Sequence, residues 1–298
     1  MEIEVKGHSG CAIEIIKEND DLCILKSTDD KKYFSRLVQQ AKKQQTAYGR
    51  EYQHIRIPQI YEIKEETDRV SIKMEYVYSK NFIGYFETAG FEQISYFVKA
   101  FILFIEKELQ VSPLQCIPAD VLRQKYRDVQ DKIEANPLLA DDKDIKTIIK
   151  RSTKIFSMTN DILMPVGICH GDLTFSNMLF NGNNYYLIDF LDSFVESPLL
   201  DIVKLRQDSA YLWSQLMYIH DYDKIRLKVI SESIDKRIDT YFGRYTWYRE
   251  YYTTFQLMNF LRILQYAHEE IVIYYLKDVL KNLSSTYKCN FLGADNKQ

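Results

Sequence analysis

The chain has 298 residues, of which 46% are hydrophobic and 27% are charged, so it can bury a sizeable core and form one or two lobes. Its 39 basic and 42 acidic residues give a formal net charge of -3, which excludes an overall field that would attract nucleic acid or an anionic membrane. The five cysteines have no CxxC spacing, and their odd number cannot pair fully within one chain, so we expect a reduced, cytoplasmic protein. No signal peptide and no run of roughly 18 apolar residues is found, and we expect neither secretion nor a membrane span.

The N-terminal part is predicted to form a small antiparallel sheet. Four short runs rich in β-branched and aromatic residues, at 11–18, 21–27, 57–66 and 69–77, are separated by charged turn segments. Between the second and third runs, residues 29–48 contain few β-branched residues and place apolar side chains at helical spacing. One helix should therefore interrupt the sheet.

After this part the pattern changes to long helical segments, which places a lobe boundary at 79–81. The predicted parts are residues 1–79 and 80–298, and the predicted fold class is α+β. One exception lies among the helices, where brief apolar runs at 164–170 and 185–190 flank a polar loop and the turn-forming Asn-Gly-Asn-Asn. These two runs predict a β-hairpin set among helices.

The segment ICHGDLTFSNMLFNGNNYYLIDF, residues 168–190, gathers side chains suited to phosphoryl transfer. That reaction needs a group to orient the attacking hydroxyl, and oxygen ligands for the magnesium ions on the β- and γ-phosphates. Asp172 lies in a tight His-Gly-Asp turn, where its carboxylate can meet an incoming hydroxyl. Asn177 offers an amide oxygen and Asp189 a carboxylate at a strand end, and both are predicted to bind magnesium.

The pattern H-x-D-x-x-x-x-N, followed by a strand ending in I-D-F, resembles the catalytic loop and metal-binding aspartate of protein kinases. The version here, HGDLTFSN with LIDF, is similar to the aminoglycoside phosphotransferase and choline kinase group. The resemblance implies a protein-kinase-like, two-lobed fold, in which residues 1–79 bind the nucleotide and residues 80–298 form a helical lobe for catalysis and acceptor binding. It also implies ATP and magnesium (Mg2+) as cofactors, and a small-molecule acceptor with a hydroxyl group.

The resemblance assigns further roles in the small lobe. Lys26, in CILKS, takes the place of the strand lysine that contacts the α- and β-phosphates. Gly7 and Gly10 correspond to the turn over the phosphates, although their spacing is not GxGxxG. The segment KMEYV is similar to the hinge, where the backbone from Glu75 to Val77 would hydrogen-bond adenine.

One departure from the kinase pattern concerns the partner of Lys26. Kinases pair this lysine with a glutamate on the following helix, but residues 31–48 contain no glutamate. Glu51 lies beyond the predicted helix, so either the helix extends further or Gln40 or Gln44 takes the place of the glutamate. The lysine would then be held less tightly.

Several neighbours of the loop have structural interpretations. His170 is grouped with Asp172 in the catalytic loop, and we interpret it as a hydrogen-bonded brace rather than a base, because the carboxylate already fills that role. Asp201, shortly before a helix start, is similar to a loop-bracing aspartate of the group. Cys169 should be a buried small hydrophobe. Asp192 is either a third acidic group in the cleft or a turn residue.

The acceptor site is expected in the helical lobe. The segment 258–270 is predicted to form one helix with Arg262 and His268 at the surface, and Tyr266, Glu269 and Glu270 are candidates for acceptor contacts. An aminoglycoside would need an acidic cluster, for which Asp192, Glu196, Asp201, Glu269 and Glu270 are the candidates. Choline would need an aromatic cage. A sugar, an amino alcohol or another metabolite hydroxyl is equally open.

Three other interpretations compete with the small-molecule kinase. A protein kinase is disfavoured because no A-P-E sequence follows Asp189. A nucleotide-binding regulator with little catalysis is favoured by the missing helix glutamate, but all three loop residues are present. The loop could also be a polar turn that only caps a hairpin, with Asp172 and Ser176 bonding to backbone amides.

Overall fold

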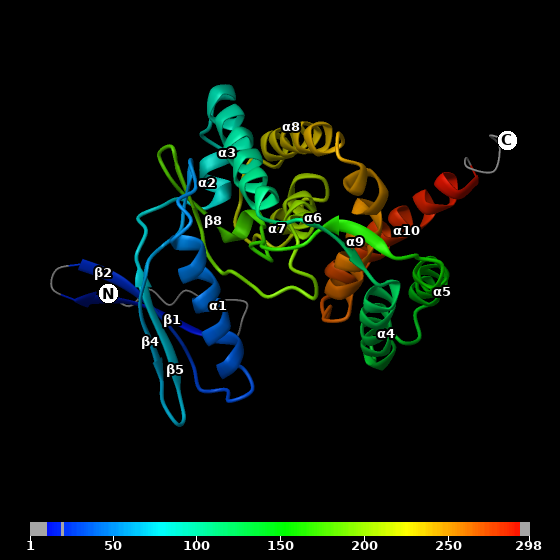
Figure 1. Ribbon diagram of the computed structural model, residues 1–298, viewed down its shortest axis with the longest axis horizontal. Coiled ribbons are helices and arrows are strands. Elements are labelled where there is room, and N and C mark those ends of the chain that lie inside the picture. The colour runs from blue at the N-terminus through cyan, green and yellow to red at the C-terminus, as the bar shows by residue number, and fades with distance from the viewer. Residues whose placement is uncertain (1–10, 19–20, 293–298) are drawn as a thin grey trace.

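The computed structural model describes residues 11–18 and 21–292, and its side chains as far as residue 285. The predicted turn with Gly7 and Gly10 lies outside these residues. The N-terminal sheet and its one helix lie on one side of the molecule, and the helices of the second part lie on the other (Figure 1). None of the helices in the described part of the chain combines the length and the apolar character that crossing a bilayer demands.

The N-terminal sheet is antiparallel, as predicted. Its strands are β1 (Ala12–Glu18), β2 (Asp21–Thr28), β4 (Ile60–Glu65) and β5 (Val70–Glu75), in the order β1-β2-β5-β4. Helix α1 (Phe34–Tyr48) interrupts the sheet in sequence, also as predicted. It packs on the sheet through Leu37, Val38 and Ala41, which share a buried cluster with Val70 and Ile72. Burial of one apolar face of each element joins this helix to the sheet.

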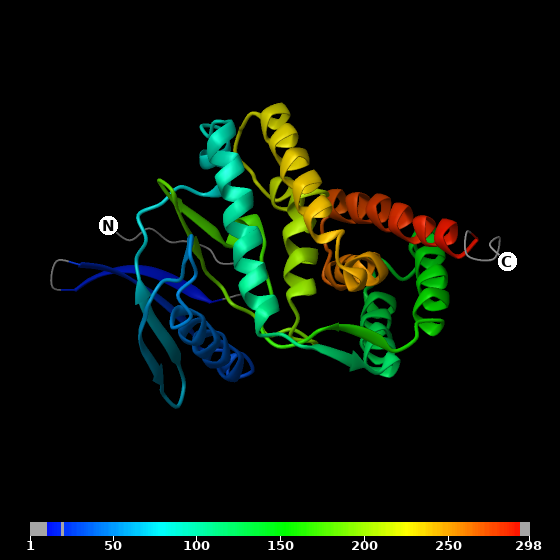
Figure 2. The same cartoon turned by 45° about the horizontal axis from the view of Figure 1, so that its top comes forward.

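The second part is helical and carries the larger core. Its helices are α2 (Phe82–Phe86), α3 (Phe91–Gln110), α4 (Ala119–Ala135), α5 (Lys143–Ser157), α6 (Pro198–Ser209), α7 (Trp213–Leu216), α8 (Lys224–Phe242), α9 (Thr246–Leu264) and α10 (Glu270–Leu292). Helix α6 lies among the others, against α3, α8 and α9 (Figure 2). This central position explains why all but one of its side chains are buried. The α+β fold class is confirmed.

The predicted hairpin was wrong in its pairing. The strand before the polar loop, β7 (Ile162–Pro165), pairs with β6 (Leu114–Ile117). The hairpin lies after the loop instead, and joins β8 (Met178–Asn181) to β9 (Asn184–Leu187). Its two-residue turn begins at Gly182, whose φ of 58° suits the tight connections that such hairpins use. The short strand β3 (Ile55–Arg56) adds to β9 in parallel, so a segment close to the N-terminal sheet completes the hairpin's sheet.

The predicted single helix over 258–270 was also wrong. Helix α9 ends at Leu264 and α10 begins at Glu270. Between them Ala267 is buried, and its carbonyl accepts a hydrogen bond from the side chain of Asn136 at 3.2 Å. This tertiary contact satisfies a backbone carbonyl at the point where the helix is interrupted.

An aromatic cluster fixes the hairpin and the polar loop to the helical core. Phe175, within the loop, is fully buried and lies 5.2 Å from Phe86 between ring centroids. Phe180, on β8, stacks on Tyr85 of α2 at 4.3 Å. The Tyr85 hydroxyl is 2.9 Å from that of Tyr185 on β9, so the buried polar groups satisfy each other. The polar loop therefore stands on a rigid apolar base.

Candidate active site

The polar loop turns sharply at Gly171, and only glycine fits there. Its φ is 90°, which side chains rarely tolerate, and a Cβ atom would lie 1.9 Å from the carbonyl oxygen of Leu191. The amide of Leu191 in turn donates to the carbonyl of His170 at 2.9 Å. The loop and the segment after Asp189 therefore touch at this glycine.

Asp201, in the first turn of α6, holds the backbone of this turn. Its two carboxylate oxygens accept hydrogen bonds from the amides of His170 at 2.5 Å and Gly171 at 2.8 Å. Burial raises the pKa of Asp201 to about 6, although these backbone amides oppose the rise. The structure thus places Asp201 in the bracing position that the resemblance implied.

Glu108, on α3, lies fully buried beside Asp201, and sequence reasoning missed it. Its carboxyl oxygens have no hydrogen-bond donor among the described residues. Burial, followed by the charge of Asp201, raises the pKa of Glu108 well above its ordinary value. We therefore interpret Glu108 as protonated, with its hydroxyl directed to Asp201. A glutamate on the core face of an otherwise apolar helix is the signal that could have identified it.

His170 is buried, and both of its ring nitrogens have backbone partners. Nδ1 accepts from the amide of Asp172 at 3.1 Å, and Nε2 lies 2.9 Å from the carbonyl oxygen of Ile188. Burial lowers the pKa of His170 to about 4, so the ring is neutral with its proton on Nε2. This geometry joins the loop to the strand end before Asp189 and leaves no ring nitrogen for a substrate.

Asp172 lies between a cation and an amide. Its Oδ1 is 3.1 Å from the ammonium of Lys204 on α6, and its Oδ2 accepts from the side chain of Asn177 at 2.9 Å. Burial alone would raise the pKa of Asp172, but the Lys204 ammonium and then His170 and Asn177 lower it below its usual range. The carboxylate is therefore ionised and fixed in direction. Lys204 was not predicted from the sequence.

Asn177 and Asp189 lie on the two sides of the β8–β9 hairpin. The Asn177 side-chain nitrogen also donates to the Asp172 carbonyl at 2.9 Å, which leaves its amide oxygen for another ligand. Asp189 has a φ of 60°, a strained conformation for a residue with a side chain. Its side chain is 42% exposed, and its carboxylate contacts Lys26. The loop thus brings the three predicted residues onto one framework.

Lys26 binds Asp189 directly, in place of a helix residue. The ammonium on β2 is 2.6 Å from Oδ1 of Asp189, and burial of Lys26 is outweighed by this carboxylate, which raises the pKa of the lysine. Gln40 and Gln44, the expected substitutes, bind elsewhere: to the Tyr33 hydroxyl and to the Pro58 carbonyl. That expectation was wrong. Glu51 lies outside α1, as predicted.

A lysine on α1 makes the contact between this helix and the helical part. The Lys43 ammonium is 2.6 Å from Oε2 of Glu196 and 2.6 Å from the carbonyl oxygen of Leu191. Cys169, buried as expected, lies 3.2 Å from the same Glu196 carboxylate. Helix α1 is therefore tied to the segment that follows Asp189. One lysine among many on a helix gives no sequence signal for this role.

The predicted hinge follows β5. The amide of Glu75 already donates to the carbonyl of Gln59 at 2.9 Å, so this amide is not free for a nucleotide. The Val77 carbonyl accepts from the Ser79 hydroxyl at 3.1 Å. The Val77 amide has no partner within the described part of the chain. Of the two residues that end the expected hinge, Val77 is therefore the one whose amide remains open.

The acceptor candidates from the C-terminal part do not converge. Glu269 and Glu270 are exposed at the break between α9 and α10, and Tyr266 is 65% exposed. Asp192 is exposed as well. Arg262 was expected at the surface with His268, but only His268 is exposed. The Arg262 guanidinium is partly buried and lies 5.7 Å from the ring centroid of Phe194, within the segment after Asp189.

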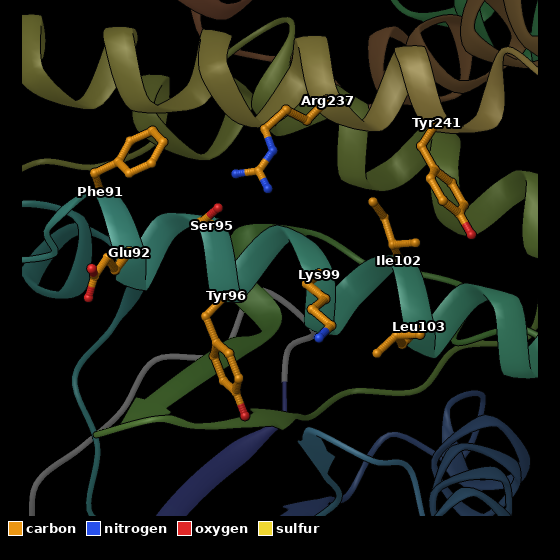
Figure 3. A pocket seen from close by; sticks show the side chains of 9 residues that line it. All are labelled: Phe91, Glu92, Ser95, Tyr96, Lys99, Ile102, Leu103, Arg237 and Tyr241. Atoms are coloured by element: carbon orange, nitrogen blue, oxygen red, sulfur yellow. The ribbon is translucent and has the colours of Figure 1, made fainter.

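A separate groove lies between α3 and α8, on the outside of the helical part (Figure 3). Its lining includes Phe91, Ser95 and Ile102 of α3, with Arg237 and Tyr241 of α8. None of the predicted site residues lines it. The candidate active site is therefore the polar loop and not this groove.

The polar loop lies within a segment that matches a known protein family. A model of the phosphotransferase enzyme family matches residues 27–227, which is more than half of the chain and includes the whole polar loop. The chain belongs to this phosphotransferase family. A search of the curated proteins finds no match to the chain.

Solved structures agree on the fold of this phosphotransferase. A point mutant of aminoglycoside 2'-phosphotransferase-IIIa in complex with GDP has a TM-score of 0.60 at 14% identity, covering 99% of this chain and 94% of that chain. A thermostable mutant of aminoglycoside phosphotransferase APH(4)-Ia in its apo form has a TM-score of 0.58 at 8% identity, covering 96% and 94%. Another mutant of it, in a ternary complex with ADP and hygromycin B, has a TM-score of 0.56 at 9% identity, covering 96% and 93%. At these identities the likeness establishes the fold alone.

Gly171→Ala should disable the phosphotransferase loop without unfolding the protein. The added methyl group collides with the Leu191 carbonyl and disfavours a φ of 90°, so the turn that carries Asp172 must move. We expect phosphotransfer activity to fall by about a hundredfold or more, as misplaced catalytic groups produce. Gly182→Ala is the matched control, since it also has a positive φ but open space around its Cβ. Equal activity in both variants would contradict the role of Gly171.

Glu108→Gln should preserve stability, whereas Glu108→Ala should reduce the free energy of unfolding by about 2–4 kcal/mol, through a cavity and a lost donor to Asp201. Because the folded pKa of Glu108 is raised, its stabilising contribution is complete below the ordinary glutamate pKa and is lost as pH rises. Wild type should therefore lose stability relative to Glu108→Gln as the pH rises above the ordinary glutamate pKa, measured by urea unfolding. Parallel pH curves would refute the buried proton. Glu92→Gln, an exposed change on the same helix, is the control.

Proposed function

We propose that this phosphotransferase moves the γ-phosphate of ATP to a hydroxyl group of a small molecule. The observation that carries the proposal is the Lys26–Asp189 ion pair, which brings a buried lysine of the N-terminal sheet to the loop that holds Asp172 and Asn177. A polar turn that only capped a hairpin would not need a buried ammonium from another sheet. Residues 1–79 would form the nucleotide-binding lobe, and residues 80–298 the lobe for catalysis and the acceptor.

Asp172 would orient the acceptor hydroxyl. In the transfer, a bond forms between the acceptor oxygen and the γ-phosphorus, and the bond from that phosphorus to the bridging oxygen breaks, with its electron pair leaving on ADP. The hydroxyl proton passes to the Asp172 carboxylate and then to water. A lowered pKa makes Asp172 a weak base, which suits a reaction that depends mainly on positioning.

Asn177 and Asp189 fit a magnesium site that is completed by phosphate and water. The described residues contain no group of three or more His, Cys, Asp or Glu side chains able to hold a metal by themselves. Magnesium commonly uses one or two protein oxygens beside the phosphates of a nucleotide, and the free amide oxygen of Asn177 with the exposed carboxylate of Asp189 supply these. When bound, the metal would neutralise charge on the β- and γ-phosphates.

Lys26 and the hinge would hold the remainder of the nucleotide. The buried ammonium of Lys26 faces the side of Asp189 on which the phosphates would lie. The open Val77 amide is a donor for adenine. Similar solved structures contain GDP in one case, and ADP with hygromycin B in another, which supports a nucleotide and a hydroxyl-bearing acceptor in this cleft. Assays should therefore compare Mg-GTP with Mg-ATP as the phosphate donor.

Asp172→Ala and Asp189→Ala should separate orientation from metal binding. Both should lower acceptor-dependent ADP release by roughly a hundred- to ten-thousand-fold. Only Asp189→Ala should weaken the binding of Mg-AMP-PNP, by about tenfold or more, because it removes a metal ligand. Calorimetry measures the binding. Asp221→Ala is the control, because it removes an exposed carboxylate from the loop that follows α7. Full turnover in either variant would refute the assignment, and tight binding without turnover on any acceptor would favour a regulator.

A further inference from the structure

A narrow hollow lies beside Asp172, on the side formed by the helical part. It is lined by Gly171, Phe194, Lys204, Phe255, Asn259 and Arg262. Phe194 stacks on Phe255 of α9 with 6.1 Å between the ring centroids. Phe194 therefore forms one wall of this hollow.

Two cations, Lys204 and Arg262, line this hollow, and a third, Lys125, approaches the Phe194 ring; the three come from three different helices. Lys204 of α6 is 3.1 Å from Asp172. Arg262 of α9 lies 5.7 Å from the Phe194 ring, and Lys125 of α4 lies 6.0 Å from the same ring. The positive charges thus gather on one aromatic side chain next to the predicted catalytic carboxylate.

Two of these cations form no ion pair among the described residues. Within the described residues, neither Arg262 nor Lys125 forms an ion pair, whereas Lys204 pairs with Asp172. Burial lowers the pKa of Lys125, and the charge of Arg262 lowers it further. Burial also lowers the pKa of Arg262; the charge of the nearby Asp172 opposes this shift, and that of Arg36 on α1 adds to it. Like charges held together in this way are stabilised by an anion from outside the chain.

Of the acidic residues that an aminoglycoside would require, Asp192 is exposed beside Phe194, and the other four either bind elsewhere or lie beyond the end of α9. Glu196 binds Lys43 and the amide of Ser193, and Asp201 binds the loop backbone. Glu269 and Glu270 are exposed beyond the end of α9. A polycation would therefore meet positive charge at this wall, at an electrostatic cost.

We propose that the acceptor is a small hydroxyl compound that also carries an oxyanion, either a carboxylate or a phosphate. Arg262 and Lys125 would bind the oxyanion over the Phe194 ring, while the hydroxyl faces Asp172. This inference rests on the proposed function. The anion is assigned to the acceptor and not to the nucleotide because Lys125 and Arg262 belong to α4 and α9, two helices of the second part that pack against each other (Figure 1).

A binding experiment tests the anion site without turnover. The full chain is first saturated with Mg-AMP-PNP, and its Tm is then followed as inorganic phosphate replaces chloride at constant ionic strength. We expect Arg262→Gln and Lys125→Gln each to weaken the apparent phosphate affinity by about tenfold or more, as loss of a charged hydrogen bond does. Arg127→Gln, on the exposed face of α4, should behave as wild type. If the Tm depends on phosphate equally in all four proteins, the phosphate is an adventitious ion only, and the proposal is overturned.

A kinetic experiment tests the acceptor class. Glycerol, glycerate and glycerol phosphate form one matched series, glucose, glucuronate and glucose phosphate form another, and choline and kanamycin are the cationic comparison. We expect kcat/KM to be higher for the members that carry an oxyanion than for glycerol and glucose. Comparison of the carboxylate with the phosphate in each series shows which oxyanion the site prefers. Arg262→Gln should raise KM for that acceptor by about ten- to a hundredfold and leave KM for Mg-ATP unchanged. Preference for choline, kanamycin or the neutral members overturns the proposal.

The anionic acceptor and the kinase function are refuted by different results. Turnover of a cationic acceptor overturns the anionic acceptor and leaves the kinase function intact. Failure of Mg-AMP-PNP to bind or to raise the Tm contradicts the proposed function, while the phosphate titration of wild type and Arg262→Gln still decides whether the anion site exists.

Discussion

The geometry of the active loop depends on one buried carboxylate, that of Asp201, bonded to two consecutive backbone amides. A turn with φ of 90° at Gly171 directs both amides inward, where water cannot satisfy them. Asp201 can do so because the Ser197 side chain begins α6 by accepting from the amide of Leu199, and its hydroxyl donates to the Pro165 carbonyl. The cost of burying that carboxylate is offset by the amides and by the protonated Glu108 beneath it.

Helix α6 supports the loop at more than one point because of helical spacing. Asp201, Lys204 and Asp208 stand at i, i+3 and i+7 and therefore share a face. Asp208 accepts from the amide of Phe175 at 2.5 Å and from Ser214, Lys204 reaches Asp172, and Asp201 holds the turn before it. Three successive turns of one helix thus determine three successive parts of the loop. Burial of the other faces of α6 in the helical core makes this support rigid.

Features that depend on neighbouring residues could be predicted from the sequence, whereas features that depend on contacts between distant segments could not. The alternating strands, α1 and the loop residues Asp172, Asn177 and Asp189 follow from periodicity and spacing. The pairing of β8 with β9 was missed because apolar runs do not specify their partners, and the break after Leu264 depends on Asn136, far away in the chain. Lys43, Lys204 and Arg262 gave no usable signal, because a charged residue on a helix is ordinarily a solvated one.

The charge relations of the strand lysine explain how the chain manages without a helix glutamate. In α1 the polar contact to the helical part comes from a cation, Lys43, which binds Glu196. Lys26 therefore has Asp189 as its acidic partner. In the proposed function, Asp189 would serve both a lysine and a metal ion and so couple the two. Once Asp189 was shared with the metal, the Lys26 ammonium would be attracted to it less strongly and would turn to a phosphate oxygen. Nucleotide binding would then exchange the pairing that replaces the glutamate.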